Sequence, residues 1–195
     1  MPTGVALRDP RQQLFDAAAR VLVRDGASEL TSRAVTAEAG VAKGVLHRHF
    51  ADFDAFLTEL VLERIAQVEA LAEDLRTAPG GVVDNLTAAL TTGFDPVAVA
   101  VVVLVIARDE LRRRLREAGA SRLPLVGEFT AVIAGYLRTE RDRGRIAADA
   151  DVDVLAPTLI GAAHLQFTEQ AAPESVRRVV ITVLAGVTPS HSDLQ

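Results

Sequence analysis

The chain has 195 residues, and 49% of them are hydrophobic, which excludes a disordered polypeptide as the default interpretation. The sequence contains no cysteine, so a disulfide framework and a cysteine-ligated zinc site are also excluded. The formal net charge of −5 is unevenly spread, because the first 50 residues hold seven Lys/Arg against five Asp/Glu, a balance that suits contact with phosphate groups at one end of the chain.

The chain is predicted to begin with a loose tail, because residues 1–8 show no periodic pattern and no secretory signal. Asp9 and Pro10 then predict a helix start, with Asp as the N-cap and Pro in the first helical position. Apolar residues follow at helical spacing until Gly26, which predicts the end of the helix. Arg11, near its start, has two interpretations: it contacts a phosphate group or it lies in solvent.

Two short helices joined by a tight turn are predicted in the segment that begins at Thr31. Thr31 is suited to cap the first helix, since its side chain can accept a hydrogen bond from a free backbone N–H. Gly40 supplies the positive φ that a sharp turn between helices requires. Leu46 and Phe50 are four residues apart and would give the second helix an apolar underside.

The outer surface of this second helix, which is predicted to begin near Ala42, is polar and cationic. It includes the only lysine of the chain, although a GC-rich coding sequence would also deplete lysine. A short helix with an apolar underside and a cationic outer side is typical of a recognition helix in a DNA major groove. The residues predicted to form the outer side are Lys43, Gly44, His47, Arg48 and His49.

This segment resembles the DNA-binding half of the tetracycline-repressor (TetR-type) family of bacterial regulators. The chain matches the family pattern at Thr31, Arg33, Ala39, Gly40, Val41, Gly44, Leu46, His49 and Phe50, with Val35 in place of an isoleucine. Two positions depart from the pattern, because His47 replaces a tyrosine and Phe53 replaces a lysine. Both of those family residues typically contact the DNA backbone. The resemblance covers the N-terminal quarter of the chain, and the rest resembles the family only in its layout.

A long helix is predicted next, capped by Asp52 and carrying an apolar stripe from Phe53 to Leu75. Residues 97–107 are β-branched and apolar, which would suit a buried strand. No second strand candidate exists to satisfy its backbone groups, so a fully buried helix is predicted there, continuing or restarting into residues 108–119. Eleven apolar residues are too few to span a bilayer.

The arginine-rich part of residues 108–119 has two interpretations. Arg112, Arg113, Arg114 and Arg116 resemble a nucleic-acid patch, but Asp109, Glu110 and Glu117 lie between and around them and favour a solvated helix end. Further helices are predicted over residues 82–92, 123–143, 151–167 and 176–185, so the chain is all-α.

No feature of the sequence supports an enzyme. Phosphate-binding glycine loops and metalloprotease motifs are absent from the sequence, and no nucleophile motif surrounds any Ser, His or Asp. His47 and His49 are two residues apart and would point in different directions on a helix, so a shared metal is not expected. Neither a cofactor nor a metal is therefore predicted.

The fold predicted is all-α, with an N-terminal three-helix head that contains the helix-turn-helix, over residues 9–52, and a larger helical ligand-binding and dimerisation body, over residues 53–187. The lack of a visible secretory signal and the short apolar run predict a cytoplasmic protein with no membrane partner. The resemblance implies a homodimeric, ligand-responsive regulator, a repressor that binds a palindromic double-stranded DNA operator. The residues expected to contact DNA are Thr31, Ser32, Arg33, Lys43, Gly44, His47, Arg48 and His49. The alternative is a helical small-molecule-binding protein with weak or lost operator binding.

The resemblance also implies an effector cavity among the helices of the body. The scarcity of aromatic residues, at 4%, disfavours stacking on large cationic dyes and favours a small lipophilic effector. A solid core without a cavity is the alternative. His164 has two interpretations, a hydrogen-bonded core or interface histidine and a polar anchor for the ligand. The candidate lining residues are Phe56, Leu60, Phe94, Val101, Val105, Phe129, Ile133, His164 and Phe167.

Overall fold

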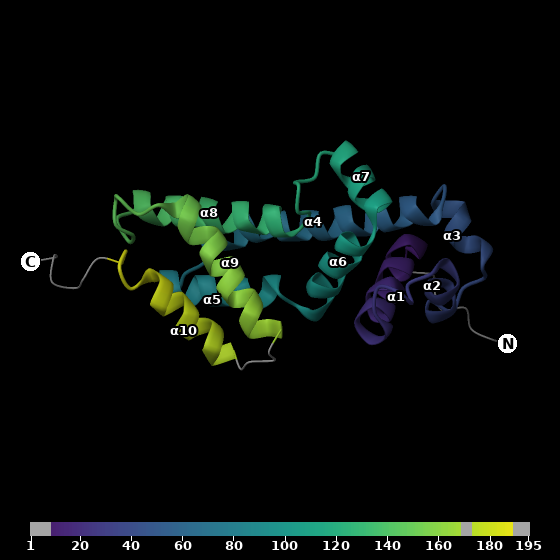
Figure 1. Cartoon of the computed structure of the whole chain (residues 1–195), viewed down its shortest axis with the longest axis horizontal. Helices are drawn as coiled ribbons and strands as arrows, with labels where there is room; N and C mark the ends of the chain where they lie inside the picture. The colour runs from purple at the N-terminus through teal and green to yellow at the C-terminus, as the bar shows by residue number, and fades with distance from the viewer. Residues whose placement is uncertain (1–8, 169–172, 189–195) are drawn as a thin grey trace, which may run out of the picture. The chain divides into compact units, whose positions relative to one another are not determined.

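The computed structural model describes residues 9–168 and 173–188, and the tail predicted at residues 1–8 lies outside them. Within the described residues the chain forms ten helices and no strand, so the predicted all-α fold is confirmed (Figure 1). The helices are α1 (Pro10–Asp25), α2 (Ser32–Glu38), α3 (Gly44–His49), α4 (Phe53–Thr77), α5 (Val82–Gly93), α6 (Pro96–Ala107), α7 (Asp109–Glu117), α8 (Val126–Asp142), α9 (Val152–Thr168) and α10 (Pro173–Leu184).

The helices form two compact units. The first unit combines the chain up to Arg64 with Pro96–Pro124, and the second combines Ile65–Asp95 with the chain from Leu125 onward. Helix α4 contributes residues to both units, whereas α1, α2, α3, α6 and α7 belong to the first unit only. The functional boundary predicted between residues 52 and 53 concerns DNA and effector binding, and it stays a prediction.

Helix α1 is the central helix of the first unit, where it packs against α2, α3 and α6. Its predicted start is confirmed, because the Arg11 N–H donates to Asp9 Oδ1 at 3.0 Å and Pro10 occupies the first turn. Its predicted end is also confirmed at Gly26, which adopts a φ of 87°. The buried side of α1 is the apolar stripe of the sequence, and it consists of Leu14, Phe15, Ala17, Ala18, Val21 and Leu22.

Helix α6 confirms the choice of helix over strand for the β-branched run. The prediction that this helix is fully buried was wrong, however, because Val103 is 52% exposed and Ile106 is 62% exposed. Only one side of the helix, which includes Val101, Leu104 and Val105, lies in the core. The chain then restarts as α7 at Asp109.

In the second unit, α8 packs against α9, and α10 packs against α5 and α9. The helix predicted over residues 123–143 begins three residues late, at Val126, because Leu125 adopts a φ of 71° that a right-handed helix does not allow. Near the end of α8, Glu140 is buried and accepts hydrogen bonds from Arg143 at 3.2 Å and from Arg145 Nη2 at 2.7 Å. A buried carboxylate needs partners of this kind to offset its lost hydration.

No single helix in residues 9–168 and 173–188 is both long enough and apolar enough to cross a membrane. Helices α5 and α6, which are joined by the non-helical residues 94 and 95, reach that length and hydropathy only when they are taken together.

Candidate nucleic-acid interface

The first helix of the predicted pair begins where the sequence indicates. Thr31 has extended backbone angles, and its Oγ1 accepts a hydrogen bond from the Ala34 N–H at 3.1 Å. This bond satisfies one of the backbone donors that a helix start leaves free. Val35 and Thr36 are buried, and the Thr36 hydroxyl donates to the Ser32 carbonyl at 2.9 Å, so the inner side of α2 is fixed.

The turn between α2 and α3 is a Schellman motif built on Gly40. Gly40 has a φ of 67°, and its N–H donates to the Ala37 carbonyl at 3.1 Å. The Val41 N–H donates to the Thr36 carbonyl at 3.0 Å, which closes the wider ring of the motif. Space for a side chain exists around Gly40, so the backbone conformation is what requires glycine here.

Helix α3 begins at Gly44, two residues after the predicted position near Ala42. Lys43 occupies the N-cap position, and its side chain makes no capping hydrogen bond. The predicted apolar underside is confirmed, since Leu46 is fully buried and Phe50 is buried. With six residues, α3 is far below the length at which an isolated helix is stable, so its geometry depends on what it packs against.

Four phenylalanine rings form the support beneath α3. The ring centroids of Phe50 and Phe56 lie 5.0 Å apart with an edge-to-face geometry, and Phe15 lies 5.5 Å from Phe56 and 5.7 Å from Phe50. Phe53, which replaces the lysine of the family pattern, stacks on Phe56 at 5.6 Å. The rings join α1, α3 and α4, and offset or edge-to-face pairs of this kind add to the free energy of burial.

Arg11 is engaged with the protein, and neither of its two predicted environments describes it fully. Its guanidinium lies 4.5 Å from the Phe50 ring centroid, donates to the His49 carbonyl at 3.3 Å and forms an ion pair with Glu59. The His49 carbonyl is at the C-terminal end of α3, where backbone acceptors are left unsatisfied. Arg11 therefore caps the end of α3, a role that no sequence signal indicates because Glu59 is 48 residues away.

The predicted DNA-contact residues are all on the outside of the α2–α3 pair. Ser32 and His49 are half-buried, and the exposed members are Thr31, Arg33, Lys43, Gly44, His47 and Arg48. Among the described residues, Arg33, Lys43 and Arg48 make no ion pair. By contrast, Arg20 and Arg24 of α1 bind Glu38 of α2 at 2.7 and 2.8 Å. The structure thus brings three unpaired cations together on one short motif.

The arginines of α7 are mostly neutralised by neighbours. Arg113 binds Glu110 and Glu117, and Arg112 forms an ion pair with Asp109. Hydrogen bonds from Arg113, and then from Arg114, lower the pKa of Glu110 to about 2. The geometry agrees with the interpretation of a solvated helix end, since these partners are three and four residues apart.

The candidate effector residues are divided between the two units. Phe56, Leu60, Val101 and Val105 are buried in the first unit, and Phe56 belongs to the ring cluster beneath α3. In the second unit, the Phe94 ring lies 5.7 Å from Phe129, 5.4 Å from Phe167 and 5.6 Å from His164. Ile133 is fully buried one turn after Phe129 on α8.

The second unit also has a groove of about 450 Å³ between α4 and α8. None of the predicted effector residues lines it. Its lining residues are Glu69, Ala72, Arg76, Glu128, Ala131, Val132, Gly135, Tyr136 and Thr139. Nowhere in the described part of the chain do three or more His, Asp or Glu side chains gather in a way that could hold a metal ion.

Residues 14–60 match the family model of bacterial regulatory proteins of the tetR family. No curated protein matches the sequence significantly. Among solved structures, the chain is similar to a gamma-butyrolactone receptor described as ArpA-like, with 23% identity, a TM-score of 0.71 and coverage of 92% of this chain and 88% of that chain.

Two further solved structures are similar over almost their whole length. The transcriptional regulator FadR from Bacillus subtilis, in complex with stearoyl-CoA, has 19% identity and a TM-score of 0.66, with coverage of 90% of this chain and 98% of that chain. Reduced NemR from E. coli has 16% identity and a TM-score of 0.71, with coverage of 93% and 100%. At these identities the likeness concerns the fold, which has an N-terminal helix-turn-helix head and a helical body.

Proposed function

We propose that the chain, whose residues 14–60 match the tetR family of DNA-binding transcriptional regulators, is a ligand-responsive repressor. The protein binds a palindromic operator as a homodimer, and a small lipophilic molecule releases it. The observation that carries this proposal is the set of exposed, unpaired cations on the α2–α3 pair.

Each proposed DNA contact follows from the position of the side chain. Lys43 stands at the start of α3 and meets a phosphate group or a guanine edge, while Gly44, which has open space around it, lets the backbone approach the groove. Arg33 and Arg48 contact phosphate groups on either side. Hydrogen bonds to the operator are completed by Thr31, Ser32, His47 and His49.

The experiment that tests the proposal is a gel shift with DNA that flanks the protein's own gene. Specific retardation at physiological salt is expected, and it should weaken steeply as salt is raised because phosphate contacts release counterions. The absence of specific retardation would favour the alternative of a small-molecule binder with weak or lost operator binding. Phe53 supports that alternative, since its ring stacks on Phe56 and supplies no cation to the DNA backbone.

The dimer is proposed to form through α8 and α9. On α9, Val154 and Leu165 are 58% and 59% exposed, and Gly161 between them has open space around it. Large exposed apolar side chains along one helix suit an isologous interface. Two heads related by a two-fold axis would then meet major grooves about 34–36 Å apart.

Gly161→Leu should yield monomers in light scattering, whereas a wild-type monomer at micromolar concentration would contradict the dimer.

The effector is proposed to be lipophilic and held mainly by burial. The ring cluster of Phe94, Phe129, Phe167 and His164 offers an apolar surface with one polar anchor. The similar structures named for gamma-butyrolactone and for stearoyl-CoA agree with a ligand of this class. An inducer must bind the DNA-incompetent state better by about 1–3 kcal/mol. A thermal-shift screen of lipophilic metabolites, followed by operator release, tests this. A hit whose affinity is unchanged by Phe129→Ala would exclude the cluster.

A further inference from the structure

Two arginines near the α6–α7 corner reach the two ends of the helix-turn-helix segment. The first is Arg108, which lies between the two helices and is part of the first unit. Its Nη2 donates to the carbonyl of Leu30 at 3.2 Å. Leu30 is fully buried and comes directly before Thr31, the residue that caps α2. Arg108 therefore fixes the point at which the chain enters the helix-turn-helix.

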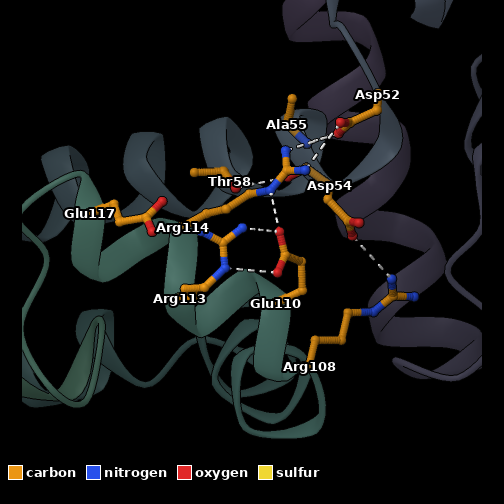
Figure 2. Close-up of polar contacts among 9 residues, drawn as sticks. All are labelled: Asp52, Asp54, Ala55, Thr58, Arg108, Glu110, Arg113, Arg114 and Glu117. Atoms are coloured by element: carbon orange, nitrogen blue, oxygen red, sulfur yellow. Dashed lines mark hydrogen bonds and ion pairs between the residues drawn. The ribbon is translucent and has the colours of Figure 1, made fainter.

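The second is Arg114 of α7, which binds the chain just after the same segment, at Asp52 (Figure 2). Its Nη1 and Nη2 donate to the two carboxylate oxygens of Asp52 at 3.0 and 3.1 Å, a two-pronged geometry. Asp52 also accepts a hydrogen bond from the Ala55 N–H at 2.6 Å, so it is the N-cap of α4. Arg114 thus fixes the position of Asp52, the last residue between α3 and α4.

The orientation of the Arg114 guanidinium is itself set by α7. Its Nε donates to Glu110 at 2.9 Å, one helical turn earlier, and Glu110 also accepts from Arg113 Nε at 3.0 Å (Figure 2). Most exposed ion pairs contribute little, but bidentate arginine–carboxylate pairs within a network are the exception. The side chain of Arg114 is 28% exposed, so most of it is removed from solvent. Hydrogen bonds from Arg114, and then the one from the Ala55 N–H, lower the pKa of Asp52.

Arg108 is supported in a similar way. Its guanidinium lies 5.8 Å from the Phe53 ring centroid, and its Nη1 is 3.8 Å from Asp54 Oδ1. Phe53 and Asp54 are the first two residues of α4. The α6–α7 corner consequently touches the chain just before α2 and just after α3, while α3 itself has no capping side chain at its start.

We propose that Arg108 and Arg114 are positioning residues for operator recognition, because they hold the chain at Leu30 and Asp52 and so fix the orientation of α3. This inference rests on the proposed DNA-binding function. Base recognition requires side chains placed within about 0.5 Å, and a six-residue helix reaches that precision only if its ends are held. Neither arginine has to contact DNA for this role.

Arg114→Gln and Arg114→Lys test the role, with Arg113→Gln as the matched control. Arg113 is one residue away, and among the residues that the structure describes its ion pairs are with Glu110 and Glu117 of the same helix. Arg114→Lys keeps the charge but loses the two-pronged geometry. Operator affinity at several salt concentrations and amide hydrogen exchange of residues 44–51 without DNA should both be measured on the full chain.

Both Arg114 variants should bind the operator about 2- to 30-fold more weakly, the range of indirect coupling through a packed network. The slope of affinity against salt should stay unchanged, because no phosphate contact is lost. Exchange of residues 44–51 should accelerate, while Arg113→Gln should match the wild type in every measurement. A double variant with Asp52→Asn should lose little more than Arg114→Gln, since asparagine retains the cap and the two changes remove the same pair.

Three results would overturn the proposal. A salt slope that falls by about one in Arg114→Gln would mean that Arg114 contacts phosphate directly. Full affinity in Arg114→Lys would mean that only charge matters. Unchanged exchange of residues 44–51 would mean that the corner does not hold α3, and this measurement applies even if the wild type binds no operator. Failure of the proposed function and failure of the positioning role are therefore separable.

Discussion

Helices α3 and α7 are both short and both rich in cationic side chains, yet they use their charge in opposite ways. In α3 and its N-cap, Lys43 and Arg48 are exposed and make no ion pair within the described residues. In α7, three of the four arginines are bound by Asp109, Glu110, Glu117 or Asp52, and Arg116 is the exception. The number of arginines alone would assign the nucleic-acid contact to α7.

The difference shows that the availability of a charge matters more than its number. An arginine that already donates to a carboxylate must break that pair before it can bind a phosphate group, whereas the unpaired Lys43 and Arg48 have no such cost. The pairing in α7 follows from acidic residues three and four positions away. The paired arginines of α7 therefore bind carboxylates of the protein itself.

The sharpest test of the comparison neutralises two cations on each helix. If Lys43 reads a guanine edge, Lys43→Gln/Arg48→Gln should lose about 1–3 kcal/mol of operator-binding free energy from that contact, and the salt slope should fall by about one because Arg48 contacts a phosphate group. If both contact phosphate groups, the salt slope should fall by about two. The measurement is a salt titration of operator affinity. Arg112→Gln/Arg113→Gln, which removes two paired cations of α7, is the matched control, and an equal loss of affinity in the control would contradict the difference between the two helices.

The comparison also predicts that the stability of α3 depends on its underside rather than its charges. Leu46→Ala should lower the free energy of unfolding by about 2–5 kcal/mol, because it removes a fully buried side chain and leaves a cavity. Denaturant unfolding measures this effect. Arg48→Gln should unfold like the wild type, and a loss of stability there would show that Arg48 has a structural partner after all.

A smaller effect is expected at the start of α2. Thr31→Ala removes the acceptor for the Ala34 N–H and should lower the free energy of unfolding by about 1 kcal/mol. Thr31→Ser keeps the hydroxyl and serves as the control. If Thr31→Ala weakens operator binding much more than it weakens folding, Thr31 also contacts DNA.

The smallest effect concerns the paired charges of α7. The folded-state pKa of Glu110, about 2, is below its ordinary value of 4.5, so its pairs stabilise the fold above about pH 4.5, and this stabilisation is lost as the pH falls toward 2. Glu110→Gln should lower the melting temperature slightly at pH 7 and not at pH 2. Glu29 is exposed and makes no ion pair among the described residues, so Glu29→Gln should leave the melting temperature equal to that of the wild type at both pH values. A Glu110→Gln effect that persists at pH 2 would point to packing instead of charge.

Features set by neighbouring residues could be predicted from the sequence. The cap at Thr31, the positive φ at Gly40 and the apolar underside of α3 each depend on residue types within one or two turns. The helix over residues 97–107 could be predicted from the whole sequence, because a strand without a partner strand would leave its backbone hydrogen-bonding groups unsatisfied. The positions of the proposed DNA contacts on one outer surface followed from the same local rules.

Features set by distant residues could not be predicted. Asp52 and Arg114 are 62 residues apart, and Arg11 and Glu59 are 48 residues apart, so their spacing carries no signal. The late start of α8 depends on Leu125 at a φ of 71°, a conformation for which leucine gives no indication. The exposed side of α6 was also missed, because its sequence is equally apolar all round.

The close approach of Gly93 to Phe129 has a consequence for how this sequence can change. A Cβ atom at position 93 would collide with three atoms of the buried Phe129 ring, so Gly93 cannot be exchanged while that ring keeps its position. The two positions should therefore covary among relatives, with a side chain at 93 accompanied by a residue smaller than phenylalanine at 129. A lineage that acquires alanine at 93 first would pass through an intermediate destabilised by this collision, and one that loses the Phe129 ring first would pass through an intermediate destabilised by a cavity.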